Sequence, residues 1–104
     1  MTESEFRQAA GQILRRIEQA ADACEGELEA DRPGEGILEL TCSDDSKIVI
    51  NQQTAQQEIW VAARSGGFHF VWRDGAWRDG RDGIELFERL RQIATQQGRV
   101  DLAL

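Results

Sequence analysis

The chain has 104 residues, 40% of them hydrophobic and 30% charged, which is the composition of a single soluble globular domain, residues 1–104, with a modest core. No apolar run approaches the roughly 20 residues of a membrane helix, and the acidic start Met1–Glu5 is unlike a secretory signal, so we expect a cytoplasmic protein. The net charge of −7 is unevenly placed. Residues 1–45 hold 12 Asp and Glu against 4 Arg, a balance of −8, and residues 46–104 hold 7 against 8 Lys and Arg, a balance of +1. This charge argues against nucleic acid or an anionic membrane as partner and favours cations or a basic protein surface.

The chain is expected to begin with an amphipathic helix. Apolar residues recur at three- and four-residue steps from Phe6 to Cys24, and Gly26 is placed to end the helix. Alternation of apolar and polar residues then predicts consecutive strands around residues 27–31, 38–42, 47–51, 59–63, 68–72 and 76–78. The segment 32–36 separates the first two strands, and Asp74-Gly75 is a two-residue hairpin signal before the last.

A second helix is predicted at the end of the chain. Asp82 and Glu85 resemble a capping box, and Gly98 follows the last inward-facing residues, which are Leu86, Phe87, Leu90, Ile93 and Ala94. Consecutive strands joined by short turns must be antiparallel, and two helices can cover one face of such a sheet. The predicted fold class is therefore α+β: a two-layer sandwich with an antiparallel sheet of about six strands, covered on one face by the N- and C-terminal helices.

Six carboxylates are predicted to gather along one edge of this fold, and we call this set the acidic ridge. At about 100° per residue, three of them share a narrow exposed strip of the first helix: Glu18, Asp22 and Glu25. Three more alternate along the first strand and so point one way: Glu27, Glu29 and Asp31. Glu3 and Glu5, at the far end of the helix, are further candidate metal ligands. A solvated face that only keeps the protein soluble is the alternative, although the charges are clustered and Arg32 is the one nearby base.

The spacing of these groups limits the chemistry of the acidic ridge. Same-face residues on a strand are ~7 Å apart, whereas a cation needs its oxygens within about 2.0–2.6 Å. One or two carboxylates can therefore hold a given ion, and we expect several weak, shallow sites for hard cations. Carboxylate oxygen alone does not choose iron over calcium, magnesium or manganese.

No catalytic constellation is evident in the sequence. His69 is the only histidine, so neither a two-histidine iron centre nor a three-histidine zinc site can form within one chain, and we expect His69 on the solvated face of the sheet. Cys24 and Cys42 are interpreted as buried thiols, with a disulfide left open. We do not expect an enzyme.

Trp60 is predicted to point away from the core, because Ile59, Val61 and Ala63 claim the inner side of its strand. Beside it lies an uncharged, amide-rich segment, Asn51–Gln57. An exposed tryptophan ringed by amides is typical of a protein-recognition patch. The alternative is that a neighbouring side chain covers Trp60. Trp72 and Trp77 are expected in core or edge packing.

Four elements in fixed order resemble the frataxin family, and most closely its bacterial CyaY branch: Ile50–Thr54, Glu58–Val61, Ser65–Phe70 and Trp77. The resemblance covers nearly the whole chain. It implies a frataxin-like fold that binds ferrous and ferric iron weakly at several sites and regulates iron–sulfur cluster assembly. It further implies docking on the cysteine desulfurase and its scaffold protein. By position, the acidic ridge would supply the iron sites, and Asn51, Gln53 and Trp60 would be the sheet-face contacts.

The chain departs from the family pattern at three positions. Gln19 replaces a second acid, Arg7 replaces a histidine of some relatives, and Ala55 replaces a loop proline. The first two departures should weaken iron binding. Two alternatives stay open: a ferroxidase or iron-storage protein that oxidises ferrous iron, and an interaction module without a metal role. We expect a monomer, with iron-induced oligomers as a further alternative.

Overall fold

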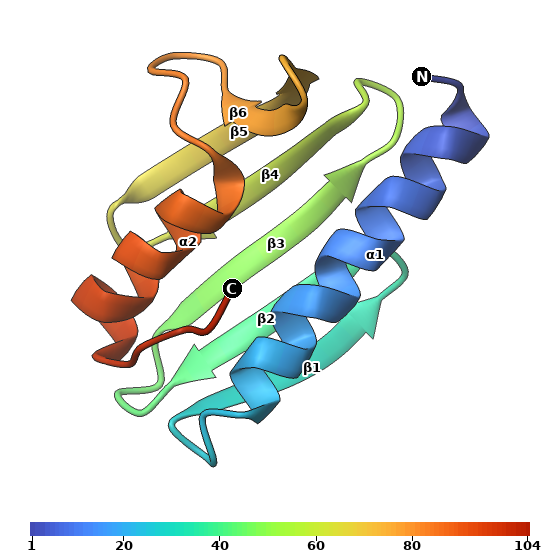
Figure 1. Cartoon of the computed structure of the whole chain (residues 1–104). Coiled ribbons are helices and arrows are strands. Elements are labelled where there is room, and N and C mark those ends of the chain that lie inside the picture. Colours follow the sequence, from blue (N-terminus) through green and yellow to red (C-terminus); the bar gives the residue numbers. More distant parts are fainter.

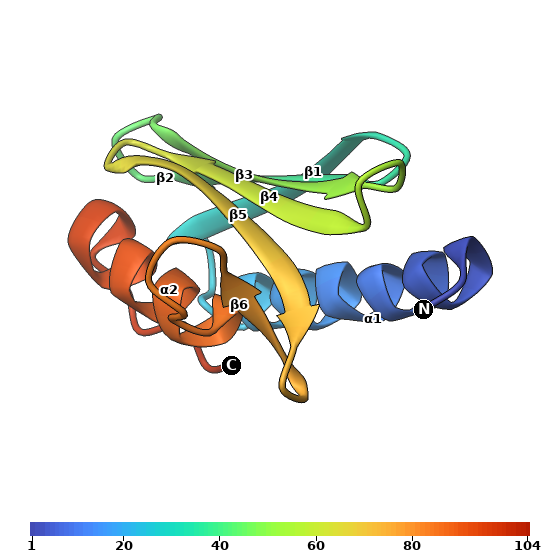
Figure 2. The ribbon, with the colours of Figure 1, turned by 90° about the horizontal axis from the view of Figure 1, so that it is seen from above.

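The computed structural model describes residues 1–104 and confirms the predicted fold class. The helices and strands are α1 (Glu3–Asp22), β1 (Leu28–Gly34), β2 (Ile37–Cys42), β3 (Lys47–Gln53), β4 (Glu58–Ala63), β5 (Gly66–Arg73), β6 (Ala76–Asp79) and α2 (Leu86–Ile93), followed by a π-helical turn, η1 (Ala94–Gly98). The strands form one antiparallel sheet in the order β1-β2-β3-β4-β5-β6. Both helices lie on the same face of this sheet, with the C-terminal segment between them (Figures 1 and 2). The opposite face of the sheet is uncovered.

The helix α1 is stabilised by a capping box at its N-terminus and by an apolar face that packs on the sheet. Thr2 is the N-cap residue: its hydroxyl accepts from the Glu5 amide while the Glu5 side chain accepts from the Thr2 amide. The residues at three- and four-residue steps are buried against the sheet: Phe6, Ala10, Leu14, Ile17 and Ala21. The helix ends at Asp22, two residues earlier than expected, and Glu25 and Gly26 turn the chain with positive φ angles of 50° and 91°.

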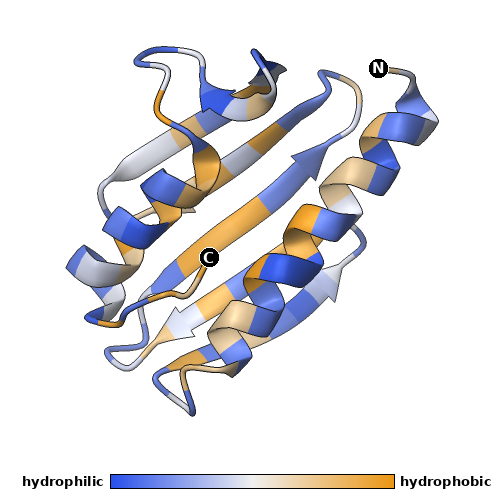
Figure 3. Ribbon diagram, viewed as in Figure 1, coloured by the Kyte–Doolittle hydropathy of each residue, from blue (hydrophilic) through white to orange (hydrophobic).

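Alternation along the strands buries one side of the sheet in a single core with both helices. That side contributes Leu28, Leu38, Leu40, Ile48, Ile50, Ile59, Val61 and Phe70 to a cluster of 22 buried residues. The middle of β3 is hydrophobic and its two ends are hydrophilic (Figure 3). Neither α1 nor α2 combines the length and the hydropathy that a membrane crossing requires.

Three more boundaries were predicted wrongly: the end of β1, the end of β3 and the start of α2. The strand β1 continues through Arg32 and Pro33 to Gly34, because a register shift after Asp31 and its position at the sheet edge accommodate the proline. The strand β3 continues to Gln53, so the first three residues of the amide-rich segment, Asn51–Gln53, pair with β4 and lie within the sheet.

The third wrong boundary is the start of the second helix. The N-cap of α2 is Glu85, whose carboxylate accepts from the amides of Phe87 and Glu88. Asp82 instead caps the preceding turn through the Ile84 amide and pairs with Arg89. A glutamate can reach the same amides as a shorter N-cap residue, which is why spacing alone misplaced the helix start.

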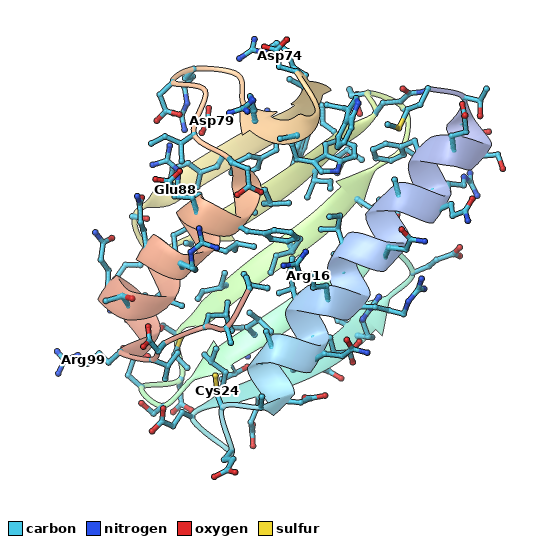
Figure 4. All side chains as sticks on the ribbon, in the orientation of Figure 1. Arg16, Cys24, Asp74, Asp79, Glu88 and Arg99 are labelled. Carbon is cyan, nitrogen blue, oxygen red and sulfur yellow. The ribbon has the colours of Figure 1, made fainter.

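Both cysteines are free thiols. Cys42 is buried as expected, whereas Cys24 is half-buried at the end of α1 (Figure 4). Burial, followed by the nearby charge of Glu27, raises the pKa of the Cys24 thiol. The protonated thiol donates to the Ala20 carbonyl oxygen at 3.5 Å.

Gln97 is a buried polar residue that fastens the C-terminal turn to the sheet. Its amide oxygen accepts from the Arg64 backbone amide at 2.9 Å, and its nitrogen donates to the Ser46 hydroxyl and the Lys47 carbonyl, each at 3.0 Å. One side chain thus joins η1 to the β2–β3 and β4–β5 turns. No sequence pattern marked this residue.

We expect Gln97→Ala to lower the free energy of unfolding by about 1–3 kcal/mol, because it leaves three polar groups without their partner. Urea denaturation would measure the loss. Gln96→Ala, next to it on the solvent side, is the matched control and should change stability by less than about 0.5 kcal/mol. Equal stability of the two variants would contradict this role of Gln97.

Candidate functional site

The structure places the acidic ridge along the β1 edge of the sheet, where α1 lies across β1 and β2 (Figure 1). It divides these residues into three groups rather than one continuous row. Asp22, Glu29 and Asp31 line one shallow concavity. Glu25 and Glu27 line a second one beside Cys24. Glu18 lines neither concavity and lies about one helical turn before Asp22 on α1.

The prediction that Glu27 extends the strand face was wrong. Glu27 lies in the turn before β1, so only Glu29 and Asp31 share the outer face of that strand, opposite Thr41 and Glu39 of β2. The strand begins one residue later because Glu25 and Gly26 first reverse the chain.

Arg32 is the one base that pairs within the acidic ridge. Its Nη2 and Nε lie 3.1 and 3.2 Å from Glu18 Oε1, and both side chains are about one-third exposed. This pair partly neutralises Glu18. The remaining five carboxylates form no ion pair, and their charge faces solvent.

The structure does not bring Glu3 and Glu5 to the acidic ridge. Glu5 lies about 20 Å from Glu18 along the helix axis, at ~1.5 Å per residue. Its carboxylate accepts from the Thr2 amide at 2.7 Å, and hydrogen bonds from Thr2 lower its pKa. Glu3 pairs with Arg7 at 3.5 Å. Both glutamates serve the start of α1, where negative charge is favourable.

Two acidic residues were missed by the sequence reasoning. Glu39 of β2 lies directly opposite Asp31 and lines the same concavity, and Asp101 lines the concavity of Glu25 and Glu27. The strand register could have found Glu39, because it alternates with Leu38 and Leu40. Asp101 carries no such signal, since its position depends on how the C-terminal segment packs.

Glu39 already has a cationic partner. Lys47 Nζ lies 3.1 Å from Glu39 Oε1 and donates to the Thr41 hydroxyl at 3.0 Å. Nowhere in the structure do three His, Cys, Asp or Glu side chains come together in a set that could hold a metal ion. Given the ~7 Å spacing of same-face strand residues, an ion at this edge could contact one or two carboxylates and would keep water elsewhere.

Trp60 lies on the uncovered face of the sheet and is half-buried. Its indole stacks on the ring of His69, with centroids 4.2 Å apart and planes 6° from parallel. The indole Nε1 donates to Glu58 Oε1 at 2.7 Å, and His69 Nδ1 lies 3.7 Å from the same oxygen. One face of the indole is therefore covered by a neighbouring side chain, and Glu58 fixes its orientation.

Asn51 and Gln53 lie beside this tryptophan. Asn51 is directly opposite Trp60 on β3, and Gln53 is opposite Glu58. His69 is exposed on this face, as its position in the strand predicted. Asn51, Gln53, Trp60 and His69 thus form a polar and aromatic surface, which we call the Trp60 face. It points away from both helices.

The other two tryptophans lie near the inner side of the β5–β6 hairpin. Trp77 is buried and makes an edge contact with Phe6 at 5.7 Å between ring centroids. Trp72 packs edge-on against Trp77 at 5.5 Å but leaves 51% of its surface exposed. The expected packing holds for Trp77, whereas Trp72 is only partly covered.

Comparisons with known proteins agree with this architecture. Residues 1–100 match the family model described as a frataxin-like domain. The "Iron-sulfur cluster assembly protein CyaY" of Dechloromonas aromatica is 47% identical over 93% of this chain and 92% of its own length. The protein of the same name from Ralstonia nicotianae is 48% identical over 100% of this chain and 95% of its own length. The frataxin of Psychromonas ingrahamii, of the CyaY protein family, superposes with a TM-score of 0.88 at 28% identity and covers 100% of both chains.

Removing the base at the acidic ridge should strengthen its binding of cations. We expect Arg32→Gln to raise the affinity for Mn²⁺ by up to about fivefold, because it frees the Glu18 carboxylate from one partly exposed ion pair. Paramagnetic broadening of the Glu18 amide resonance would measure the change. Arg15→Gln removes an exposed arginine without an ion pair and is the control. An unchanged or weaker affinity in Arg32→Gln alone would contradict the expectation.

Proposed function

Because the chain belongs to the frataxin-like (CyaY) family, we propose that it is an iron-binding regulator of iron–sulfur cluster assembly that docks on the cysteine desulfurase and its scaffold protein. The observation that carries the proposal is the placement of five unpaired carboxylates along one edge of the sheet. The relatives named as assembly proteins span over nine-tenths of the chain, which supports the same role here.

The acidic ridge suits docking on a basic surface. Like charges held together raise the free energy of the free protein, and a basic partner relieves that repulsion. Exposed charges of this kind act mainly on the association rate and are screened by salt. The cysteine desulfurase would therefore carry an arginine- or lysine-rich patch where the acidic ridge meets it.

The same carboxylates would hold iron, weakly and at more than one place. Asp22, Glu29 and Asp31 offer oxygen ligands in one concavity, and Glu25 and Glu27 offer them in the other. Oxygen ligands suit hard cations but do not select iron, so selectivity would come from the iron available where the protein works. A bound ion would lower the negative charge of the acidic ridge and so weaken its pairing with a basic partner. The affinity of this protein for the assembly machinery would in this way depend on the concentration of iron.

The Trp60 face would supply the second contact, with the scaffold protein. Tryptophan is common among residues that dominate binding energy, and the neighbouring amides of Asn51 and Gln53 can donate and accept hydrogen bonds. Because Glu58 and His69 hold the indole in place, little side-chain entropy would be lost on binding. The acidic ridge lies at the β1 edge and the Trp60 face over β3, β4 and β5, so two partners could bind together.

Neutralising part of the acidic ridge should abolish the regulation. In the triple variant Glu18→Gln, Asp22→Asn and Glu25→Gln, we expect the association rate with the desulfurase to fall about tenfold at low ionic strength. Surface plasmon resonance would measure the rate, and the visible absorbance of the cluster on the scaffold would measure cluster formation. The pair Asp74→Asn and Glu88→Lys raises the net charge by the same three units away from the acidic ridge and should behave as wild type. If the triple variant still modulates assembly normally, the proposal fails.

Truncating Trp60 should weaken the contact with the scaffold protein without affecting the contact with the desulfurase. We expect Trp60→Ala to weaken binding of the scaffold protein by about tenfold or more, as for an interface hot spot, while leaving the affinity for the desulfurase unchanged. Trp60→Phe, which keeps a ring on His69, should lose less. Isothermal titration calorimetry with each partner would measure both affinities. Equal scaffold binding by wild type and Trp60→Ala would remove this surface from the proposal.

A further inference from the structure

A groove on the helix side of the molecule lies outside both the acidic ridge and the Trp60 face. It lies between α1 and α2 at the end of the β5–β6 hairpin and encloses about 520 Å³. Residues from four segments line it: Ile13, Arg16, Trp72, Phe87, Arg91 and Leu104. Because the helices cover the opposite side of the sheet from Trp60, this groove faces away from the Trp60 face (Figure 2).

The floor of the groove is apolar, and one of its large side chains, Trp72, is unusually exposed to solvent. Trp72 is 51% exposed, and the only other exposed large hydrophobic residue is Met1. Half-buried Ile13 of α1 and half-buried Phe87 of α2 line the same groove. Trp72 rests edge-on against the buried Trp77, so its ring is held in place rather than free in solvent. A fixed, exposed tryptophan in an apolar groove is typical of a surface that a partner covers.

Two arginines give the groove a charge opposite to that of the whole protein. Arg16 lies over the ring of Phe87, with its guanidinium carbon 4.4 Å from the ring centroid (Figure 4). One Nη of Arg91 donates to the main-chain oxygen of the last residue, Leu104, at 3.3 Å, which leaves its other N–H groups free. Neither pairs with an Asp or Glu side chain, although the chain has 19 acidic residues. Each guanidinium therefore keeps donors for an external carboxylate.

The one acidic side chain in the lining, that of Glu85, forms no ion pair with these arginines. Glu85 is the N-cap residue of α2, and its two oxygens accept from the backbone amides of Phe87 and Glu88. The helix amides thus hold its charge in place. The groove combines an apolar floor with two cations in a chain whose net charge is −7.

We propose that this groove binds an amphipathic segment of a partner protein, whose apolar side chains cover Trp72 and whose carboxylates pair with Arg16 and Arg91. The complementary charge identifies the segment as acidic, in contrast to the basic partner of the acidic ridge. The groove is open to solvent between two helices, which suits a helical segment laid along it, whereas a small ligand is usually enclosed over most of its surface. This surface is independent of the proposed docking at the acidic ridge.

Two synthetic peptides would test the proposal. Each has about 15 residues, the length at which an isolated helix begins to form, with leucines along one face. One carries glutamates and the other lysines on the flanking positions. The readout is the indole N–H resonance of Trp72, assigned with Trp72→Phe. We expect the glutamate peptide to shift the Trp72 resonance and leave that of Trp60 unchanged, with binding that weakens as salt is added. The lysine peptide should leave Trp72 unchanged.

Variants of the two arginines complete the test. Arg16→Gln with Arg91→Gln should weaken binding of the glutamate peptide by about three- to tenfold, the range that two exposed ion pairs supply. Arg16→Lys with Arg91→Lys keeps both charges and should retain most of the affinity. Arg15→Gln with Arg99→Gln removes two arginines that also lack ion pairs but lie outside the groove, and should have no effect. Thermal unfolding would check each fold.

Three results would overturn the proposal. The first is a Trp72 shift with the lysine peptide as large as with the glutamate peptide. The second is unchanged binding in the double glutamine variant. The third is a Trp72 shift produced by octanoate but not by the glutamate peptide, which would make the groove a site for small carboxylates. Loss of regulation by the acidic ridge variants would not affect any of these readouts.

Discussion

The burial of one side of the sheet under two helices determines every surface of this protein. Period-two alternation sends Leu40, Ile50 and Val61 toward the helices, and the same alternation sends their neighbours to the open side. A shift of one residue in any strand would exchange the two sets. The register is therefore held by the core, and with it the positions of Glu29, Asp31 and Trp60. The candidate functional residues need no further interaction to fix their positions, because they occupy the outward-facing positions that alternate with the core residues.

The distribution of charge over the surface follows from the same arrangement of sheet and helices. The β1 edge has no further strand beside it, so carboxylates there face solvent and their repulsion is screened by water and salt. Acidic side chains also protect an exposed edge from pairing with another chain. Between α1 and α2, Arg16 and Arg91 lie beside apolar side chains. The molecule thus separates an acidic edge from a cationic and apolar groove, although its total charge would suggest an acidic surface throughout.

The local sequence pattern predicted the helices and strands. The predictions failed at positions whose structure depends on tertiary contacts. The helix face of Phe6, Leu14 and Ile17 and the alternating strands were readable because core burial repeats with the period of each element. The extension of β1 past Pro33 was not, because a proline is acceptable only at an edge, and edge position depends on strand order. Gln97 was missed for a related reason: its three partners come from residues 46, 47 and 64, so no local signal exists. The acidic ridge was predicted as a set, but its division into two concavities depends on the turn at Glu25 and Gly26 and on the packing of Asp101.

The geometry of the acidic ridge also constrains how iron and a partner protein could influence each other. If Asp22 and Glu25 contact both a cation and a basic partner, the two ligands compete for the same charge. Thermodynamic linkage then requires that the partner weaken cation binding by the same factor as the cation weakens partner binding. With one or two carboxylates per ion the cation affinity is low, so the acidic ridge would fill only when iron is abundant. A tight, closed metal site would instead stay filled and could not respond to supply. The wide spacing of these carboxylates is therefore what a sensor of iron supply needs, whereas a storage or catalytic centre would need its ligands brought together.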